Sequence, residues 1–149
     1  MPSRKKIFEY WQHKLSNAKT DNTCFKCSAT SIFGDSVMVD RAHILAVCEG
    51  GSDDVSNIHL LCRGCHKDSE AHSGDEYRLW IDSKNKEEFG KALFVLWNSK
   101  ELTNTRLDLY FNKVKDDYIK DTGELMYEFI IKGYEFECES ILNKYRSIP

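Results

Sequence analysis

The sequence of 149 residues lacks the features that mark membrane and secreted proteins. It has no run of about 18 apolar residues, the length that a transmembrane helix requires, so we expect no membrane span. Its first seven residues include Arg4, Lys5 and Lys6 and contain no apolar stretch like that of a secretory signal. Internal repeats, low-complexity tracts and long linkers are also missing. These absences predict a single globular domain, residues 1–149, in the cytoplasm.

The sequence also lacks the excess of positive charge that is common in nucleic-acid-binding proteins. It has 21 Lys and Arg against 24 Asp and Glu, which gives a formal net charge of −3. The charge is uneven, however, because residues 1–20 carry five basic side chains and only one acidic side chain, Glu9. Two interpretations stay open for Arg4, Lys5 and Lys6: they contact phosphates, or they form the solvated face of a helix.

The sequence does contain six cysteines. A disulfide framework requires an oxidising compartment, which the missing signal argues against. Four cysteines form two Cys-x-x-Cys pairs: Cys24, Cys27, Cys62 and Cys65. This spacing is typical of a structural zinc site, in which each pair supplies two thiolates from one tight turn. We therefore predict that Zn²⁺ joins these two segments, and that Cys48 and Cys138 are free thiols.

Hydrophobic periodicity predicts a mostly helical chain with a short β-rich centre. The expected helices are 4–18, 63–72, 87–97, 102–119 and 124–146. Residues 36–45 are expected as a strand, and 58–61 as a second strand or the entry into the next helix. The apolar segment 76–83 does not distinguish helix from strand. The predicted buried stripe of helix 102–119 consists of Leu107, Tyr110, Phe111, Val114 and Tyr118, and helix 124–146 has a broad apolar surface.

The residues between and beside the two cysteine pairs form a motif. Its parts are Asp40-Arg-Ala-His43-Ile44, the loop Gly50-Gly51-Ser52-Asp53-Asp54 followed by Asn57, and Cys62-Arg-Gly-Cys65-His66. In order and spacing, this segment resembles the HNH (ββα-metal) endonuclease family, in the form that carries a structural four-cysteine zinc. The resemblance covers residues 24 to about 70, a third of the chain, and the flanks 1–20 and 75–149 match no family that we can name.

Together with the apolar periodicity, the resemblance implies an α+β fold that is mostly helical. Its centre would be a ββα-metal core at residues 21–74, held together by the four-cysteine zinc. An N-terminal helix within residues 1–20 and a helical region at 75–149 would flank this core. The C-terminal region is expected to serve dimerisation or target recognition, so a homodimer is a possible assembly.

The resemblance also implies an activity, the metal-dependent hydrolysis of DNA phosphodiester bonds. His43 would be the general base, since the reference pKa of a histidine side chain is near neutral and suits proton transfer at physiological pH. Asn57 would hold the loop with its side-chain amide, and His66 would bind the catalytic ion, Mg²⁺ or Mn²⁺. Arg41 and Arg63 are further candidates for phosphate contacts, although an exposed Arg is commonly only solvated.

One position departs from the family pattern. Many members have a metal ligand directly before the base histidine, where this sequence has Ala42. Asp40 lies two residues earlier, on the same side of a strand, and we expect it to hold the ion together with His66. Otherwise His66 holds the ion alone, or the site is degenerate. The family motif places the loop acids Asp53 and Asp54 away from the metal.

Several biological roles are compatible with this motif. We favour a restriction enzyme in a bacterium, because two-fold dimers suit palindromic sites, over a phage-encoded nicking enzyme or a defence effector. Two rival functions remain: a catalytically inactive HNH scaffold that binds nucleic acid, and a zinc domain whose helical surface docks a protein partner.

Overall fold

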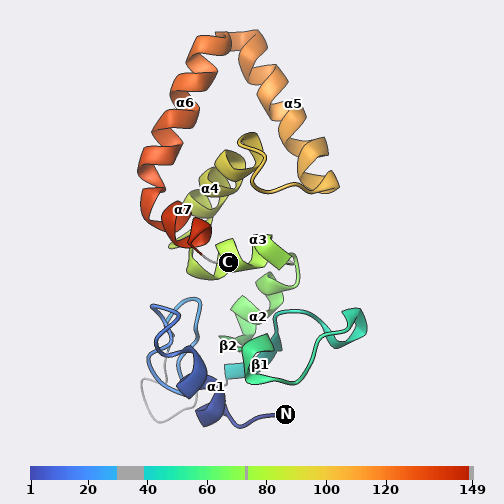
Figure 1. The fold of residues 1–149 in the computed structure, drawn as a ribbon, viewed down its shortest axis with the longest axis vertical. Coiled ribbons are helices and arrows are strands. Elements are labelled where there is room, and N and C mark those ends of the chain that lie inside the picture. Colours follow the sequence, from blue (N-terminus) through green and yellow to red (C-terminus); the bar gives the residue numbers. More distant parts are fainter. Residues whose placement is uncertain (30–38, 73, 148–149) are drawn as a thin grey trace. The chain divides into compact units, whose positions relative to one another are not determined.

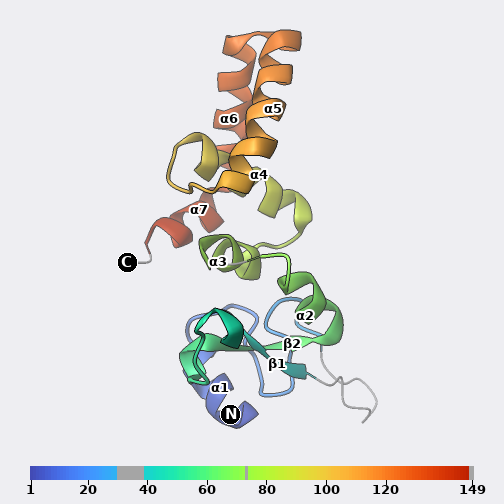
Figure 2. The ribbon, with the colours of Figure 1, turned by 90° about the vertical axis from the view of Figure 1, so that its right-hand side faces the viewer.

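The computed structural model describes residues 1–29, 39–72 and 74–147. The chain falls into two compact units, Met1–Asp82 and Ser83–Pro149 (Figures 1 and 2). The protein is mostly helical with one small antiparallel sheet, as the α+β prediction expects. In the described part of the chain, no helix is both long and apolar enough to cross a membrane. The expectation that residues 1–149 form a single domain stays a prediction.

The first unit is built around two short strands. Its elements are α1 (Arg4–Trp11), β1 (Val39–His43), η1 (Val47–Glu49), η2 (Val55–Asn57), β2 (Ile58–Cys62), α2 (Arg63–Ser69) and α3 (Gly74–Asp82). The strands pair antiparallel, with Val39 opposite Cys62 and His43 opposite Ile58. The predicted order of strand, loop, strand and helix is confirmed, and residues 58–61 are strand rather than helix entry. The predicted start of the first strand, residues 36–38, lies outside the described residues.

Helix α1 ends at Trp11, well before its predicted end at residue 18. The indole Nε1 of Trp11 donates to the carbonyl oxygens of Val55, at 2.9 Å, and Ile58, at 2.8 Å. Farther along, the side-chain amide of Asn17 donates to the carbonyl oxygen of Lys26 at 2.8 Å. These bonds hold the end of α1 and the turns after it against backbone groups elsewhere in the unit. The prediction was wrong here because these partners are distant in sequence.

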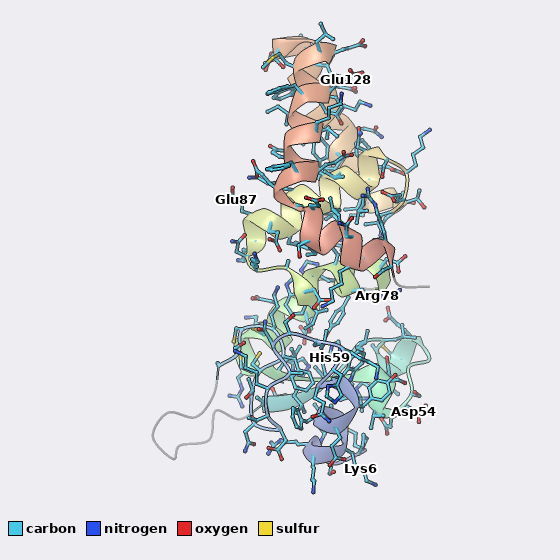
Figure 3. All side chains as sticks on the ribbon, turned by 60° about the vertical axis from the view of Figure 1, so that its left-hand side comes forward. Lys6, Asp54, His59, Arg78, Glu87 and Glu128 are labelled. Carbon is cyan, nitrogen blue, oxygen red and sulfur yellow. The ribbon has the colours of Figure 1, made fainter. Side chains whose placement is uncertain are left out.

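His59 of β2 anchors the core of the first unit (Figure 3). Its side chain is 2% exposed, and its ring contacts Trp11 of α1 and Phe25 between the first two cysteines. Its Nδ1 lies 2.9 Å from the hydroxyl oxygen of Tyr77 on α3. Burial lowers the pKa of His59 to about 3, so the ring is neutral at physiological pH. His59 therefore has a structural role. In the segment 76–83, residues 76–82 are helical and belong to α3.

The second unit is helical. Its elements are α4 (Lys86–Asn98), α5 (Thr105–Thr122), α6 (Glu124–Glu137) and α7 (Glu139–Arg146). Phe94 and Trp97 of α4 pack with Phe111 of α5, and Phe94 also contacts Tyr127 of α6. Asn104 caps α5, because its side chain accepts a hydrogen bond from the amide of Arg106 at 2.8 Å. This cap explains why α5 starts later than predicted.

Two predictions for the second unit were wrong. The single helix 124–146 is two helices, because the backbone leaves helical geometry at Cys138, with φ −104° and ψ 13°. The Cys138 thiol lies 3.7 Å from the carbonyl oxygen of Glu88 on α4, a contact that anchors this bend. In α5, Leu107 and Phe111 are buried, whereas Tyr110 and Val114 are exposed, so the buried stripe is narrower than predicted.

Candidate functional site

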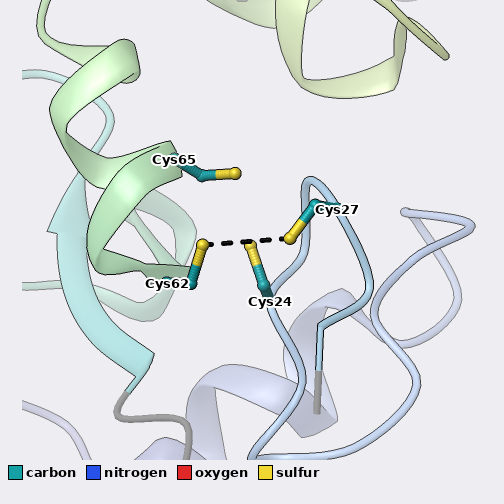
Figure 4. Close-up of side chains that lie close together, drawn as sticks. All are labelled: Cys24, Cys27, Cys62 and Cys65. Atoms are coloured by element: carbon teal, nitrogen blue, oxygen red, sulfur yellow. Dashed lines mark hydrogen bonds between the residues drawn. The ribbon is translucent and has the colours of Figure 1, made fainter.

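The four paired cysteines meet in one cluster (Figure 4). Cys24 and Cys27 come from the segment that follows α1, Cys62 ends β2, and Cys65 lies in the first turn of α2. Their sulfur atoms all lie within 4.8 Å of one another. Among the described residues, this is the only group of three or more His, Cys, Asp or Glu side chains placed to hold a metal ion. The predicted clustering is therefore confirmed.

The spacing of the sulfur atoms fits a zinc ion. Four sulfurs bound tetrahedrally at about 2.3 Å from Zn²⁺ are separated from one another by about 3.8 Å. The sulfur atoms of Cys27 and Cys62 are 3.8 Å apart. Soft thiolates are also the ligands that Zn²⁺ prefers for structural sites. The four residues therefore match a closed zinc site in both distance and chemistry.

The electrostatics of the cluster call for a cation. Burial, together with the nearby charge of Cys24, raises the pKa of the Cys65 thiol well above its usual range. Burial also raises the pKa of Cys24 itself. Thiols this close resist losing their protons together, because the resulting thiolates repel one another. A positive ion among them removes this repulsion. A bound Zn²⁺ supplies that charge, and it would lock β2 and α2 to the segment of Cys24 and Cys27.

The loop between β1 and β2 is held by Asn57. The Oδ1 atom of Asn57 accepts from the amide of Leu45 at 2.9 Å, and its Nδ2 donates to the carbonyl oxygens of Leu45, at 3.0 Å, and Ser52, at 2.8 Å. One side chain thus uses both its donor and its acceptor to join the two sides of the loop. Because His43 ends β1 two residues before Leu45, this clamp sets the path of the chain just beyond the histidine.

Two glycines allow the loop to close. Gly50 has φ +93°, in the left-handed region that favours glycine. Gly51 lies against the opposite side of the loop, where a Cβ atom would be 1.8 Å from the carbonyl oxygen of Leu45 and 2.9 Å from Nδ2 of Asn57. A side chain at position 51 would therefore collide with the same groups that Asn57 binds.

His43 has a carboxylate partner that the sequence analysis did not predict. Its Nε2 lies 2.8 Å from Oδ1 of Asp53, while the His43 side chain is only 17% exposed. We expected the acids of this loop to lie away from the catalytic ion, and no sequence pattern pointed to a contact with the base. Ten residues separate His43 and Asp53, and only the folded loop brings them together.

Asp40 and His66 form a second close pair. Oδ2 of Asp40 lies 3.2 Å from Nδ1 of His66, and both side chains are about one-third exposed. Two atoms that bind one ion at about 2.1 Å in adjacent octahedral positions are about 3.0 Å apart, so this separation suits a shared ion. The pair supplies one oxygen and one nitrogen, and water or phosphate would have to complete the shell.

His43 and His66 line the same cavity, which has a volume of about 490 Å³. The wall is formed by the end of β1, by η1 and by α2 with the residues that follow it. Four more lining side chains carry chemically active groups that the sequence analysis did not assign to the site: Cys48, Glu49, Glu70 and His72. Cavities with convergent polar groups are the usual sites of catalysis.

The predicted phosphate contacts lie at several positions of the first unit. On α1, Lys5 and Lys6 are exposed and Arg4 is half-buried, and Lys5 is 4.0 Å from Glu9. Arg41 is exposed on β1, two residues from His43 and thus on the same side of the strand. Arg63 is exposed at the start of α2.

Comparison with known proteins supports the assignment of this site. The family model of the HNH endonuclease matches residues 24–72. No curated protein and no solved structure matches the chain. The matched segment contains the four clustered cysteines, the Asn57 clamp, and His43 and His66 of the cavity. Residues 24–72 are therefore an HNH endonuclease domain.

Proposed function

We propose that the protein is a metal-dependent endonuclease that hydrolyses DNA phosphodiester bonds. The observation that carries this proposal is the shared cavity of His43 and His66. A general base and a metal ligand act on the same phosphate only if both reach one space. The family assignment supports the nuclease class, and the cavity supports an intact rather than a degenerate site.

Each residue of the site has a role in this proposal. His43 takes a proton from the attacking water. Asp40 and His66 would hold Mg²⁺ or Mn²⁺, which neutralises charge on the phosphate and the departing oxygen when it is bound. Asn57 holds the loop that follows His43. The products would carry 5′-phosphate and 3′-hydroxyl ends, as in the family that the sequence resembles.

A plasmid-nicking assay tests the proposal directly. Supercoiled DNA incubated with the protein and Mg²⁺ or Mn²⁺ should become nicked or linear, and EDTA should prevent this change. An inactive HNH scaffold would shift the plasmid in a gel without cutting it. A zinc domain that docks a protein partner would neither bind nor cut the DNA, and either of these results would contradict the proposal.

Asp40→Asn should raise the metal concentration that gives half-maximal cleavage, because an amide is a weaker ligand for a hard cation than a carboxylate. We expect a shift of roughly 10-fold or more, the scale of losses at metal-site residues, with partial rescue by excess Mn²⁺. Asp68→Asn is the matched control, since Asp68 is an exposed acid of α2. If Asp40 serves only the fold, the variant will melt earlier while its metal dependence stays that of the wild type.

The basic residues of α1 should contribute a salt-sensitive part of DNA binding. In the triple variant Arg4→Ala, Lys5→Ala and Lys6→Ala, the slope of log affinity against log salt should fall by about 0.9 for each phosphate that the variant no longer neutralises. Lys14→Ala is the control, because its ammonium donates to the carbonyl oxygen of Tyr10 at 2.9 Å. Fluorescence anisotropy over a salt series measures both slopes, and an unchanged slope assigns these side chains to solvent.

The setting of the reaction is also part of the proposal. We favour a restriction-type enzyme in a bacterial cytoplasm, where a reducing environment keeps the cysteines available for zinc. Phage-encoded nicking and defence remain alternative roles. The second unit would recognise the target or mediate a homodimer, because α6 exposes Leu125, Phe129 and Phe136. Sedimentation with and without a palindromic duplex would distinguish a dimer from a monomer.

A further inference from the structure

We propose that Asp53 is a positioning residue for His43, fixing the imidazole so that Nδ1 receives the proton of the attacking water. The inference rests on the proposed role of His43 as general base and adds a residue to it. Asp53 belongs to the loop between the strands, whereas Asp40 and His43 lie on β1 and His66 lies on α2.

The contact with Asp53 determines the tautomer of His43. An ionised carboxylate only accepts hydrogen bonds, so the 2.8 Å contact with Asp53 Oδ1 requires a hydrogen on Nε2. A neutral imidazole carries one ring hydrogen, which leaves a lone pair on Nδ1. Among the described residues, no hydrogen bond to Nδ1 of His43 is found. The carboxylate therefore selects the tautomer in which Nδ1 is ready to accept a proton.

The contacts of the loop hold the backbone next to Asp53. Asp53 follows Ser52, whose carbonyl oxygen accepts from Nδ2 of Asn57 at 2.8 Å. The backbone directly before Asp53 is thus held in place, although the Asp53 carboxylate is 60% exposed. Asn57 acts on His43 through this path, from its amide to Ser52 and then to Asp53.

The tautomer of His43 matters for the proposed reaction. General-base catalysis needs the accepting nitrogen within hydrogen-bond reach of the water, in the correct tautomer. When the nucleophile leaves its proton on Nδ1, the ring becomes a cation, and the Asp53 carboxylate stabilises that cation through Nε2–H. In the Ser-His-Asp triad a carboxylate does the same for its histidine, and replacing it with Asn leaves the wrong tautomer.

Asp53→Ala and Asp53→Asn test the inference, with Asp54→Asn as the matched control in the same loop. Under single-turnover conditions, both Asp53 variants should cleave on the order of 10- to 100-fold more slowly, a part of the usual contribution of a general base. DNA affinity and the metal concentration for half-maximal rate should not change. Asp54→Asn removes the same charge without touching His43 and should cleave within about 3-fold of the wild type, because its carboxylate only contacts Ser52.

Nuclear magnetic resonance of ¹⁵N-labelled histidine gives a readout that is independent of cleavage. The wild-type His43 ring should show one tautomer with the hydrogen on Nε2, and Asp53→Ala should show a mixture of both. A wild-type chain that never cuts DNA would refute the proposed function. An unchanged tautomer in Asp53→Ala, cleavage near the wild-type rate, or a higher metal requirement would overturn this inference while leaving the nuclease function in place.

Discussion

Cys62→Ser should lose both the bound zinc and the cooperative folding of the Met1–Asp82 unit. A structural zinc site contributes on the order of 10 kcal/mol to the folding of a small domain. This is comparable to the whole stability of a typical domain, about 5–15 kcal/mol. The Cys62 thiol belongs to a cluster that joins the end of β2 and the start of α2 to the segment of Cys24 and Cys27. Without one ligand, nothing neutralises the remaining thiolates.

Elemental analysis for zinc and thermal unfolding by circular dichroism measure this result. Cys48→Ser is the matched control, because Cys48 is an exposed cysteine outside the cluster. Part of the helical signal should persist in Cys62→Ser, since the Ser83–Pro149 unit has its own aromatic core. A zinc-free wild-type protein that unfolds at the normal temperature would refute the structural role of the metal.

His43→Ala should abolish cleavage while preserving the fold and the affinity for DNA. Removing a general base costs about 10²- to 10⁴-fold in rate, and the loss falls on the chemical step because the base binds little of the ground state. The fold should tolerate the change, since the only hydrogen bond of the His43 ring within the described residues is the one to Asp53.

Single-turnover cleavage and anisotropy of labelled DNA separate these two effects. His13→Ala serves as the control, because His13 is an exposed histidine that does not line the cavity. Residual cleavage above about a tenth of the wild-type rate would be too much for a missing general base and would assign the role to another group.

The sequence by itself determined the metal cluster and the order of elements in the first unit. Ligand pairs separated by two residues define a tight turn locally, so Cys24 and Cys27, and likewise Cys62 and Cys65, are identifiable before any fold is known. The role of Gly50 was also a local property, because glycine is the residue that permits the left-handed backbone found there. Mostly helical flanks followed from apolar periodicity in the same way.

Tertiary structure decided where the elements end and which side chains meet. Trp11, at the end of α1, bonds carbonyl oxygens 44 and 47 residues away, and Cys138 divides the last helix beside Glu88. Periodicity cannot report such contacts, since it describes one segment at a time. Exposure of Tyr110 in α5 has the same cause, because packing partners rather than residue type decide which apolar side chains are covered.

The candidate site also has features that the sequence predicts and features that only the tertiary structure shows. His43, Asn57 and His66 were identifiable from their order and spacing beside the cysteines. The pairing of Asp40 with His66 was also expected, because Asp40 shares a strand face with Ala42, whereas the common cavity and the Asp53 carboxylate at His43 were visible only in the folded chain. A loop closed by Asn57 and Gly51 brings Asp53 to His43, and the packing of α2 against β1 brings His66 to Asp40. A hydrogen bond needs its two atoms within about 3 Å, and only tertiary structure specifies that distance for residues far apart in sequence.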